Sequence, residues 1–79
     1  MKRHETLLNY TVVYRLEPEG GYTVLVPALP GCVTFGKTLA KARKMALEAI
    51  QLYVDCLVDE GQPVPLDQTV CVEKLAAAI

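Results

Sequence analysis

The sequence predicts a single α+β domain, with a three-stranded antiparallel sheet followed by one long helix and a fourth strand. Three observations predict this fold. Residues 8–16 and 22–26 alternate apolar and polar side chains, with a turn rich in proline and glycine between them. Residues 39–57 carry apolar side chains at helical spacing. At 79 residues, the chain is the length of one domain, so we treat residues 1–79 as one unit.

The first two strands are expected to form a β-hairpin. Pro18 and the glycine pair that follows it favour a turn, because proline fixes one backbone angle and glycine accepts positive φ. Pro27 has no backbone N–H for a ladder and is expected to end the second strand. Pro30 and Gly31 predict a second turn, and residues 32–35 a short third strand. One face of the first strand would carry Leu8, Tyr10, Val12, Tyr14 and Leu16.

The helix has start and stop signals at both ends. Thr38 suits the N-cap position, because its hydroxyl can accept from a free amide of the first turn. Gly61 suits the position after the last helical residue, and prolines at 63 and 65 prevent continuation. The helix would have about 22 residues, or ~33 Å. Residues 69–75 alternate again and predict the fourth strand, giving the order β-β-β-α-β.

Composition indicates a homo-oligomer in the cytoplasm. The chain is 52% hydrophobic with a mean hydropathy of +0.26, and a domain this small has much surface for its volume. No apolar run is long enough to span a membrane, and no secretory leader is evident. The three cysteines are widely spaced and lack a zinc pattern, so we expect reduced thiols and neither metal nor cofactor.

The sequence does not contain a recognisable set of catalytic residues. A nucleophilic Cys32 would need a base, and His4 is the sole histidine. Glu73 is the only acidic residue inside a predicted strand, and residues 36–38 match only the end of a phosphate-binding loop. We therefore interpret Cys32 as a small apolar residue packed after a tight turn whose backbone freedom Gly31 supplies. A thiol or metal-dependent enzyme built on Cys32 and His4 remains a rival hypothesis.

A second rival is an orphan homo-oligomeric regulator that binds nucleic acid through a basic helix start. Lys37, Lys41, Arg43 and Lys44 lie near the predicted first turns. The net charge of −1 argues against direct nucleic-acid binding, because affinity for phosphates rests on an excess of positive charge.

Several motifs lie in register along residues 10–65. They are Leu29-Pro30-Gly31-Cys32, then Gly36 and Thr38, an alanine-rich helix, and Gly61-Gln-Pro-Val-Pro65. This segment resembles the N-terminal domain of HicB antitoxins. The resemblance implies a partial ribonuclease-H-like fold, assembly into dimers or tetramers, and an antitoxin that masks a small RNA-cleaving HicA toxin.

The sequence departs from the family pattern at three positions. Ala28, Lys37 and Lys41 stand where the family often has acidic residues. After Pro65 the residues suffice for one strand and a tail, so we expect a stand-alone member without a DNA-binding domain.

The residues predicted to contact a partner form two groups. One is the rigid apolar turn segment, and the other is the acidic end of the helix, which would suit a basic toxin. The predicted contact residues are Pro27, Leu29, Pro30, Gly31 and Cys32 in the first group, and Asp55, Asp59 and Glu60 in the second.

Overall fold

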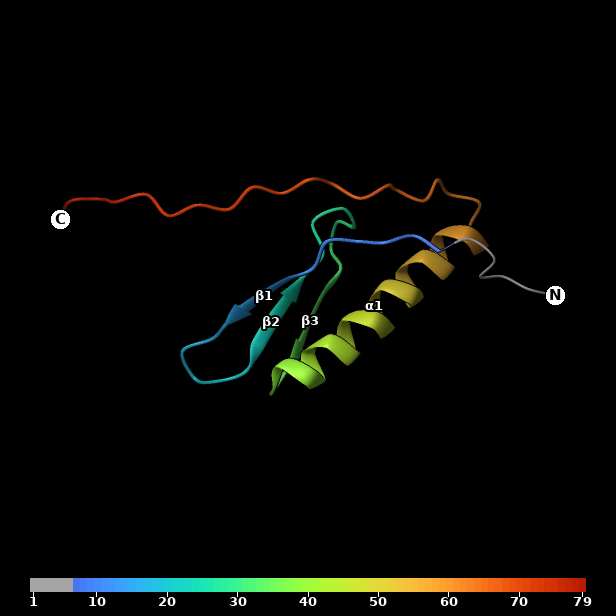
Figure 1. Cartoon of the computed structure of the whole chain (residues 1–79). Helices are drawn as coiled ribbons and strands as arrows, with labels where there is room; N and C mark the ends of the chain where they lie inside the picture. Colours follow the sequence, from blue (N-terminus) through green and yellow to red (C-terminus); the bar gives the residue numbers. More distant parts are fainter. Residues whose placement is uncertain (1–6) are drawn as a thin grey trace.

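The computed structural model describes residues 7–79, and its three strands and one helix occupy two layers (Figure 1). Strands β1 (Val13–Leu16), β2 (Tyr22–Leu25) and β3 (Val33–Gly36) form an antiparallel sheet in the order β1-β2-β3. Helix α1 (Leu39–Asp59) packs on one face of that sheet. The predicted α+β class, the meander and the long helix are confirmed.

The hairpin between β1 and β2 is held by its turn. Leu16 pairs with Tyr22, and Glu17 both donates to the Gly21 carbonyl and accepts from the Gly20 amide, each at 2.9 Å. Gly20 and Gly21 have φ of 99° and 85°, a conformation that glycine adopts without steric cost. The carboxylate of Glu17 also accepts from the Thr23 hydroxyl and from Arg15, and these hydrogen bonds lower the pKa of Glu17.

Strand β1 is shorter than the predicted strand over residues 8–16. Its partner β2 ends at Leu25, and the next amide, of Val26, donates to the Cys32 carbonyl at 3.3 Å within the following loop. Pro27 has no N–H to donate. Residues 8–12 therefore have no strand opposite them, although Tyr10 and Val12 still pack against the core as the alternation predicts.

The core lies between the sheet and the helix in two adjoining clusters. In the first, Val24 packs against Ala42 and Ala46 of α1, with exposures of 0%, 0% and 2%. The small alanines let the helix approach the strands closely. A Cβ added to Gly36 would lie 2.3 Å from the backbone nitrogen of Ala42, so the end of β3 almost touches the first turn of α1. The second cluster contains Val26, Leu29 and Cys32.

Both helix ends match the predicted signals. The Thr38 hydroxyl accepts from the Lys41 amide at 3.1 Å, which satisfies one of the orphan donors of the first turn. At the other end Gly61 has φ of 69°, its amide donates to Val58 at 3.1 Å, and the Gln62 amide donates to Leu57 at 2.8 Å. This pair of bonds is the Schellman motif that ends helices at glycine.

The predicted fourth strand is not formed. Residues 69–75 are extended but pair with no strand among the described residues, and every residue from 66 to 79 is exposed. Figure 1 shows this C-terminal segment passing the beginning of β1 and running on beyond the hairpin. An alternating sequence can favour an extended backbone, but a strand needs a neighbour to supply its hydrogen bonds, and this segment has none in the described part of its own chain.

Candidate protein-interaction surface

The turn segment over residues 26–32 is a compact loop closed by its own backbone. The Leu29 amide donates to the Val26 carbonyl at 3.0 Å, and the Cys32 amide donates to the Leu29 carbonyl at 2.9 Å. Gly31 has φ of 82°, so a residue with a side chain would be strained there. Sequence reasoning about the Pro-Gly turn therefore identified the correct glycine.

Two of the predicted contact residues in this loop face inward. Leu29 is 0% exposed and Cys32 is 6% exposed, and both pack with Ile50 and Tyr53 of the helix. Burying a leucine fully is worth about 1.5–3 kcal/mol, so Leu29 anchors the loop to α1. Pro27 is half-buried, whereas Pro30 and Gly31 are exposed.

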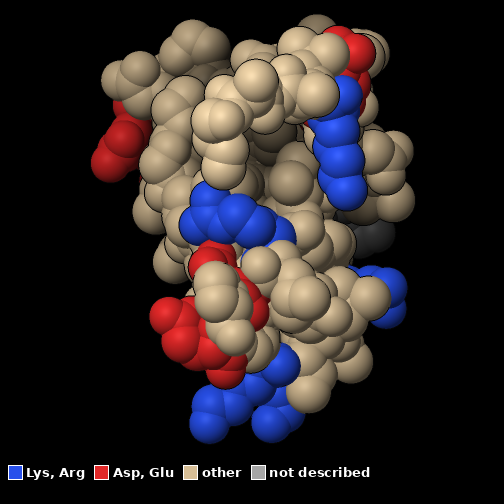
Figure 2. Space-filling model, turned by 90° about the vertical axis from the view of Figure 1, so that its left-hand side faces the viewer, with Lys and Arg blue, Asp and Glu red and all other residues tan. Residues whose placement is uncertain are grey.

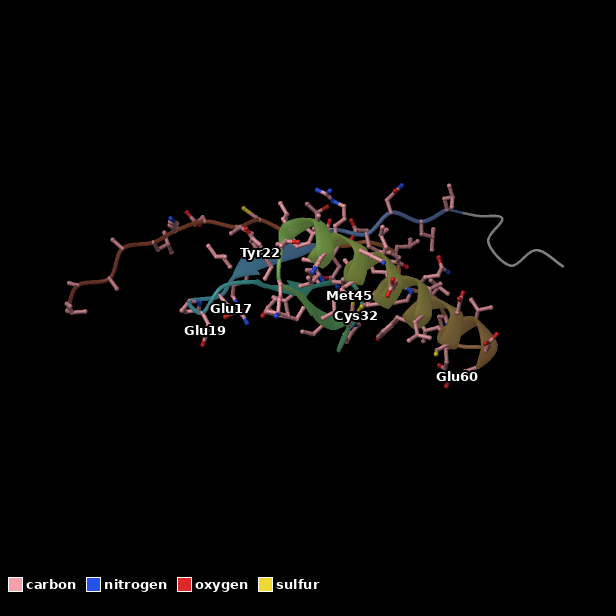
Figure 3. All side chains as sticks on the ribbon, turned by 90° about the horizontal axis from the view of Figure 1, so that it is seen from below. Glu17, Glu19, Tyr22, Cys32, Met45 and Glu60 are labelled. Atoms are coloured by element: carbon pink, nitrogen blue, oxygen red, sulfur yellow. The ribbon has the colours of Figure 1, made fainter. Side chains whose placement is uncertain are left out.

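Cys32 has the surroundings of a structural residue. Its thiol is buried beside the helix, where Figure 3 shows it, and this burial raises its pKa and keeps the thiol protonated. The interpretation of Cys32 as an apolar packing residue is confirmed. His4, the base that a thiol enzyme would need, lies outside the described residues.

Beside the loop, an apolar groove of about 430 Å³ opens between β3 and the second half of α1. The hydroxyl of Tyr53 donates to the Pro30 carbonyl at 2.7 Å and joins the loop to the helix at the groove. Leu52 is 66% exposed in this groove, and Val33 is 55% exposed. The residues that line the groove include Gly31, Cys32, Leu52, Tyr53, Cys56 and Glu60.

Of the three acidic residues predicted to contact a partner, only Glu60 lines the groove. Glu60 lies at the far end of α1 (Figure 3). Asp55 is half-buried and accepts a hydrogen bond from Gln51 at 3.0 Å, and Asp59 is exposed; neither lines the groove. The structure thus brings Gly31, Cys32 and Glu60 to one surface and places the two aspartates outside it.

Sequence reasoning did not assign Leu52, Tyr53 or Cys56 to a binding surface. The signal was present in their spacing, because residues 49, 52, 53 and 56 fall on one helical face. That spacing marks a buried face equally well. Only the tertiary packing decides that Ala49 and Tyr53 are partly buried against the core whereas Leu52 and Cys56 stay exposed.

On the face that Figure 2 draws, the basic side chains do not form one continuous surface. Lys37, Lys41, Arg43 and Lys44 are all exposed. Figure 2 shows basic and acidic side chains at several separate places on one side of the molecule, without a basic stripe. A nucleic-acid binder gathers its positive charge along the path of the phosphates.

Residues 7–79 contain neither a cluster of metal ligands nor a membrane-spanning helix. No three His, Cys, Asp or Glu side chains of this part gather so that they could hold a metal ion. The one helix in the same range, α1, is not apolar enough to cross a membrane.

The groove, the closed Pro-Gly-Cys loop and the helix with its Gly61 end together cover the region of the family resemblance. Residues 10–78 match the family described as HicB-like antitoxins of bacterial toxin–antitoxin systems. The chain belongs to this family. Membership agrees with a role that is not enzymatic and implies a toxin as partner in general terms.

Relatives with similar sequences carry two kinds of name. A UPF0150 protein of Synechocystis sp. is 41% identical over 64 residues, which are 81% of each chain. A UPF0150 protein of Thermoplasma acidophilum is 42% identical over 76% of this chain and 87% of its own. The antitoxin HicB of Escherichia coli K12 is 32% identical over 75% of this chain but only 43% of its own length.

Proposed function

We propose that this protein is the antitoxin of a HicA/HicB-type pair and that it works by covering a small, basic, RNA-cleaving toxin. The observation that carries the proposal is the family match over residues 10–78, which spans the sheet, the loop and the helix. The relative named antitoxin HicB supports it.

The groove is the surface that we assign to the toxin. Leu52 and Val33 expose large apolar side chains beside the rigid 26–32 loop, and a hydrophobic centre of this kind is typical of protein interfaces. Gly31 and Glu60 line the groove, Pro30 adjoins Gly31, and all three would touch the partner. Pro27, Leu29 and Cys32 hold the loop in shape from beneath.

Charge supports the same end of the molecule. Glu60 lies in the groove, and Asp55 and Asp59 precede it on the last two turns of α1. Carboxylates at a rim attract a basic partner and speed its encounter, with an effect that falls as salt rises. No bond is made or broken in this mechanism, because the antitoxin acts by occupying the surface with which the toxin would bind RNA.

A matched pair of leucines on one helix tests the groove. Leu47 and Leu52 are each 66% exposed, but only Leu52 lines the groove. With a HicA-type toxin captured from the protein's own cells at low salt, Leu52→Asp should weaken binding by about 30-fold or more. Leu47→Asp should leave binding within about twofold, and RNA-cleavage assays should follow the same order.

Two results would contradict the proposal. If the protein purified at low salt brings down only itself, it has no toxin partner. If it instead retards RNA or DNA in a salt-dependent way, and Lys41→Glu with Lys44→Glu abolishes that retardation, the regulator hypothesis is correct. Equal loss of toxin binding in Leu47→Asp and Leu52→Asp would leave the antitoxin role intact but remove the groove as its surface.

A further inference from the structure

The C-terminal segment over residues 69–75 exposes apolar side chains on both of its faces. Val70 and Val72 share one face and are 38% and 79% exposed, and Leu75, on the opposite face, is 81% exposed. Its backbone is extended and enters no ladder among the described residues. In Figure 1 the segment runs above the sheet and the helix and is separated from both. Valines at alternate positions of a strand lie on one face, and burying that face against other side chains is favourable.

The segment is nevertheless held firmly where it leaves the body. Asp67 accepts from both the amide and the hydroxyl of Thr11, at 2.8 and 2.7 Å. The hydroxyl of Tyr10 donates to the Pro65 carbonyl. Burial and then the charge of Asp67 raise the pKa of Tyr10, so this donor keeps its proton. The anchor fixes where the segment departs, just ahead of β1.

Strand β1 has a free edge beside that anchor. Hydrogen-bonded pairs alternate along an antiparallel ladder, and Glu17 donates to Gly21 across the hairpin. The amides of Val13 and Arg15 therefore point to β2, whereas those of Tyr14 and Leu16 point away from the sheet. β1 pairs only with β2 in the described sheet, so these outward amides form an unpaired edge that can accept another strand.

The chain exposes more surface than a compact monomer of its mass, and the excess is large enough to form a dimer interface. The chain exposes 6487 Å², whereas a compact monomer of 8.7 kDa exposes about 4,700 Å². The excess is about 1,700 Å². Even half of it equals the roughly 800 Å² that each partner buries in a stable interface of standard size. The core of the single chain is correspondingly small, with seven buried apolar residues among those described.

We propose that two copies of this chain exchange their C-terminal segments, so that residues 69–75 of each copy form a fourth strand on the free β1 edge of the other. The exchange closes after two copies, because each donates one strand and accepts one. It places the valines of each segment beside the side chains of β1 on one face of the extended sheet, and it satisfies the outward amides of Tyr14 and Leu16 in both copies. The fourth strand that the sequence predicts thus forms between chains.

The chain favours exchange over pairing with its own β1. The segment meets its own body at Asp67, and beyond that point it runs on while β1 continues in its own direction (Figure 1). No hydrogen bond between described residues joins residues 69–79 to β1 of the same chain. Within one chain, the outward amides of β1 have no strand to pair with, and Val72 of the segment stays exposed. A second copy supplies a strand for the β1 edge and a sheet edge for the segment.

The first test compares tail and helix valines. Mass measurement by light scattering across protein concentrations should give twice the 8.7 kDa of one chain. The double variant Val70→Asp/Val72→Asp should raise the dimer dissociation constant by about 100-fold or more. The control Val58→Asp changes a valine of α1 that is 54% exposed, and it should leave the dimer intact.

The second test separates exchange from pairing within one chain. One partner carries Arg15→Cys with Cys56→Ser and Cys71→Ser, and the other carries only Cys56→Ser and so keeps Cys71. After the two are mixed and refolded together, a short bismaleimide should join them into a covalent heterodimer. Glu48→Cys in place of Arg15→Cys should give little of that product.

Three outcomes would overturn the proposal. The full chain could remain a monomer at high concentration, or the dimer could persist unchanged in the double valine variant. A single chain that carries Arg15→Cys and keeps Cys71 could also cross-link only internally, with no cross-linked product in the mixed sample. None of these assays involves a toxin, so the exchange and the antitoxin role can each fail without the other.

Discussion

Two stretches of nearly the same sequence differ in how far their side chains are buried. Residues 23–26 read Thr-Val-Leu-Val and residues 69–72 read Thr-Val-Cys-Val. In the first, Val24 is 0% and Val26 is 4% exposed. In the second, Val70 is 38% and Val72 is 79% exposed.

The difference comes from neighbours. Residues 22–25 lie between β1 and β3, so ladders on both sides satisfy their backbone, and α1 covers one face. Residues 69–72 follow the Asp67 anchor and meet no strand in the described part of their own chain. Alternating apolar residues thus indicate that a segment can form a strand with one covered face. Whether its side chains are buried depends on which other elements pack against it.

The largest effect is expected at the closest packing in the body. In Gly36→Ala the new Cβ would lie 2.3 Å from the nitrogen and 2.4 Å from the Cα of Ala42. These are backbone atoms, so the helix itself must move, and we expect a loss of about 3 kcal/mol or more in urea unfolding. Gly20→Ala, in open space with φ of 99°, should cost only about 1–2 kcal/mol. Equal losses would show that β3 and α1 are not in close contact.

A pair of identical substitutions addresses the comparison directly. Val24→Ala should lower the free energy of unfolding by about 2 kcal/mol, because it leaves a cavity against Ala42 and Ala46. Val70→Ala, measured at the lowest workable protein concentration, should cost less than about 0.5 kcal/mol. At high concentration the cost of Val70→Ala should rise if the segments are exchanged. A large cost of Val70→Ala at every concentration would mean that the segment folds onto its own chain.

The smallest effect is expected at the anchor between the two regions. The hydrogen bonds from Thr11 lower the pKa of Asp67, so the folded carboxyl releases its proton more readily than the unfolded one. The contribution of this anchor is therefore present above the unfolded pKa of about 3.9 and is lost as the pH falls through the lower folded value.

The amide resonance of Thr11 should report this loss. It should shift as Asp67 gains its proton below about pH 4, and Asp67→Asn should abolish the shift. Glu19, exposed at the hairpin turn, offers a control, because Glu19→Gln should leave the Thr11 titration unchanged. A Thr11 amide that does not titrate would show that the anchor is absent in solution.

Local signals accounted for most of the body. Thr38 and Gly61 begin and end the helix as their side-chain and backbone chemistry requires, and the glycine pair at 20–21 makes the hairpin turn. Of the predicted contact residues, the sequence could not separate the inward Leu29 and Cys32 from the outward Pro30 and Gly31, because a tight loop turns successive residues in different directions. It also could not join Glu60 to Gly31, since their proximity arises only when α1 lies along β3.

The sequence by itself determined the class, the order of the three strands and the helix, the turns and the helix ends, because each depends on residues within one or two turns of chain. The tertiary structure alone decided which apolar residues are covered. Leu29 is buried because the helix passes over its loop, whereas Leu52 of that helix lines the open groove and remains exposed. Val72 lies in the same sequence pattern as Val24 but lacks the strands and the helix that cover Val24. Burial requires two surfaces in contact, and the sequence of one segment specifies only one of them.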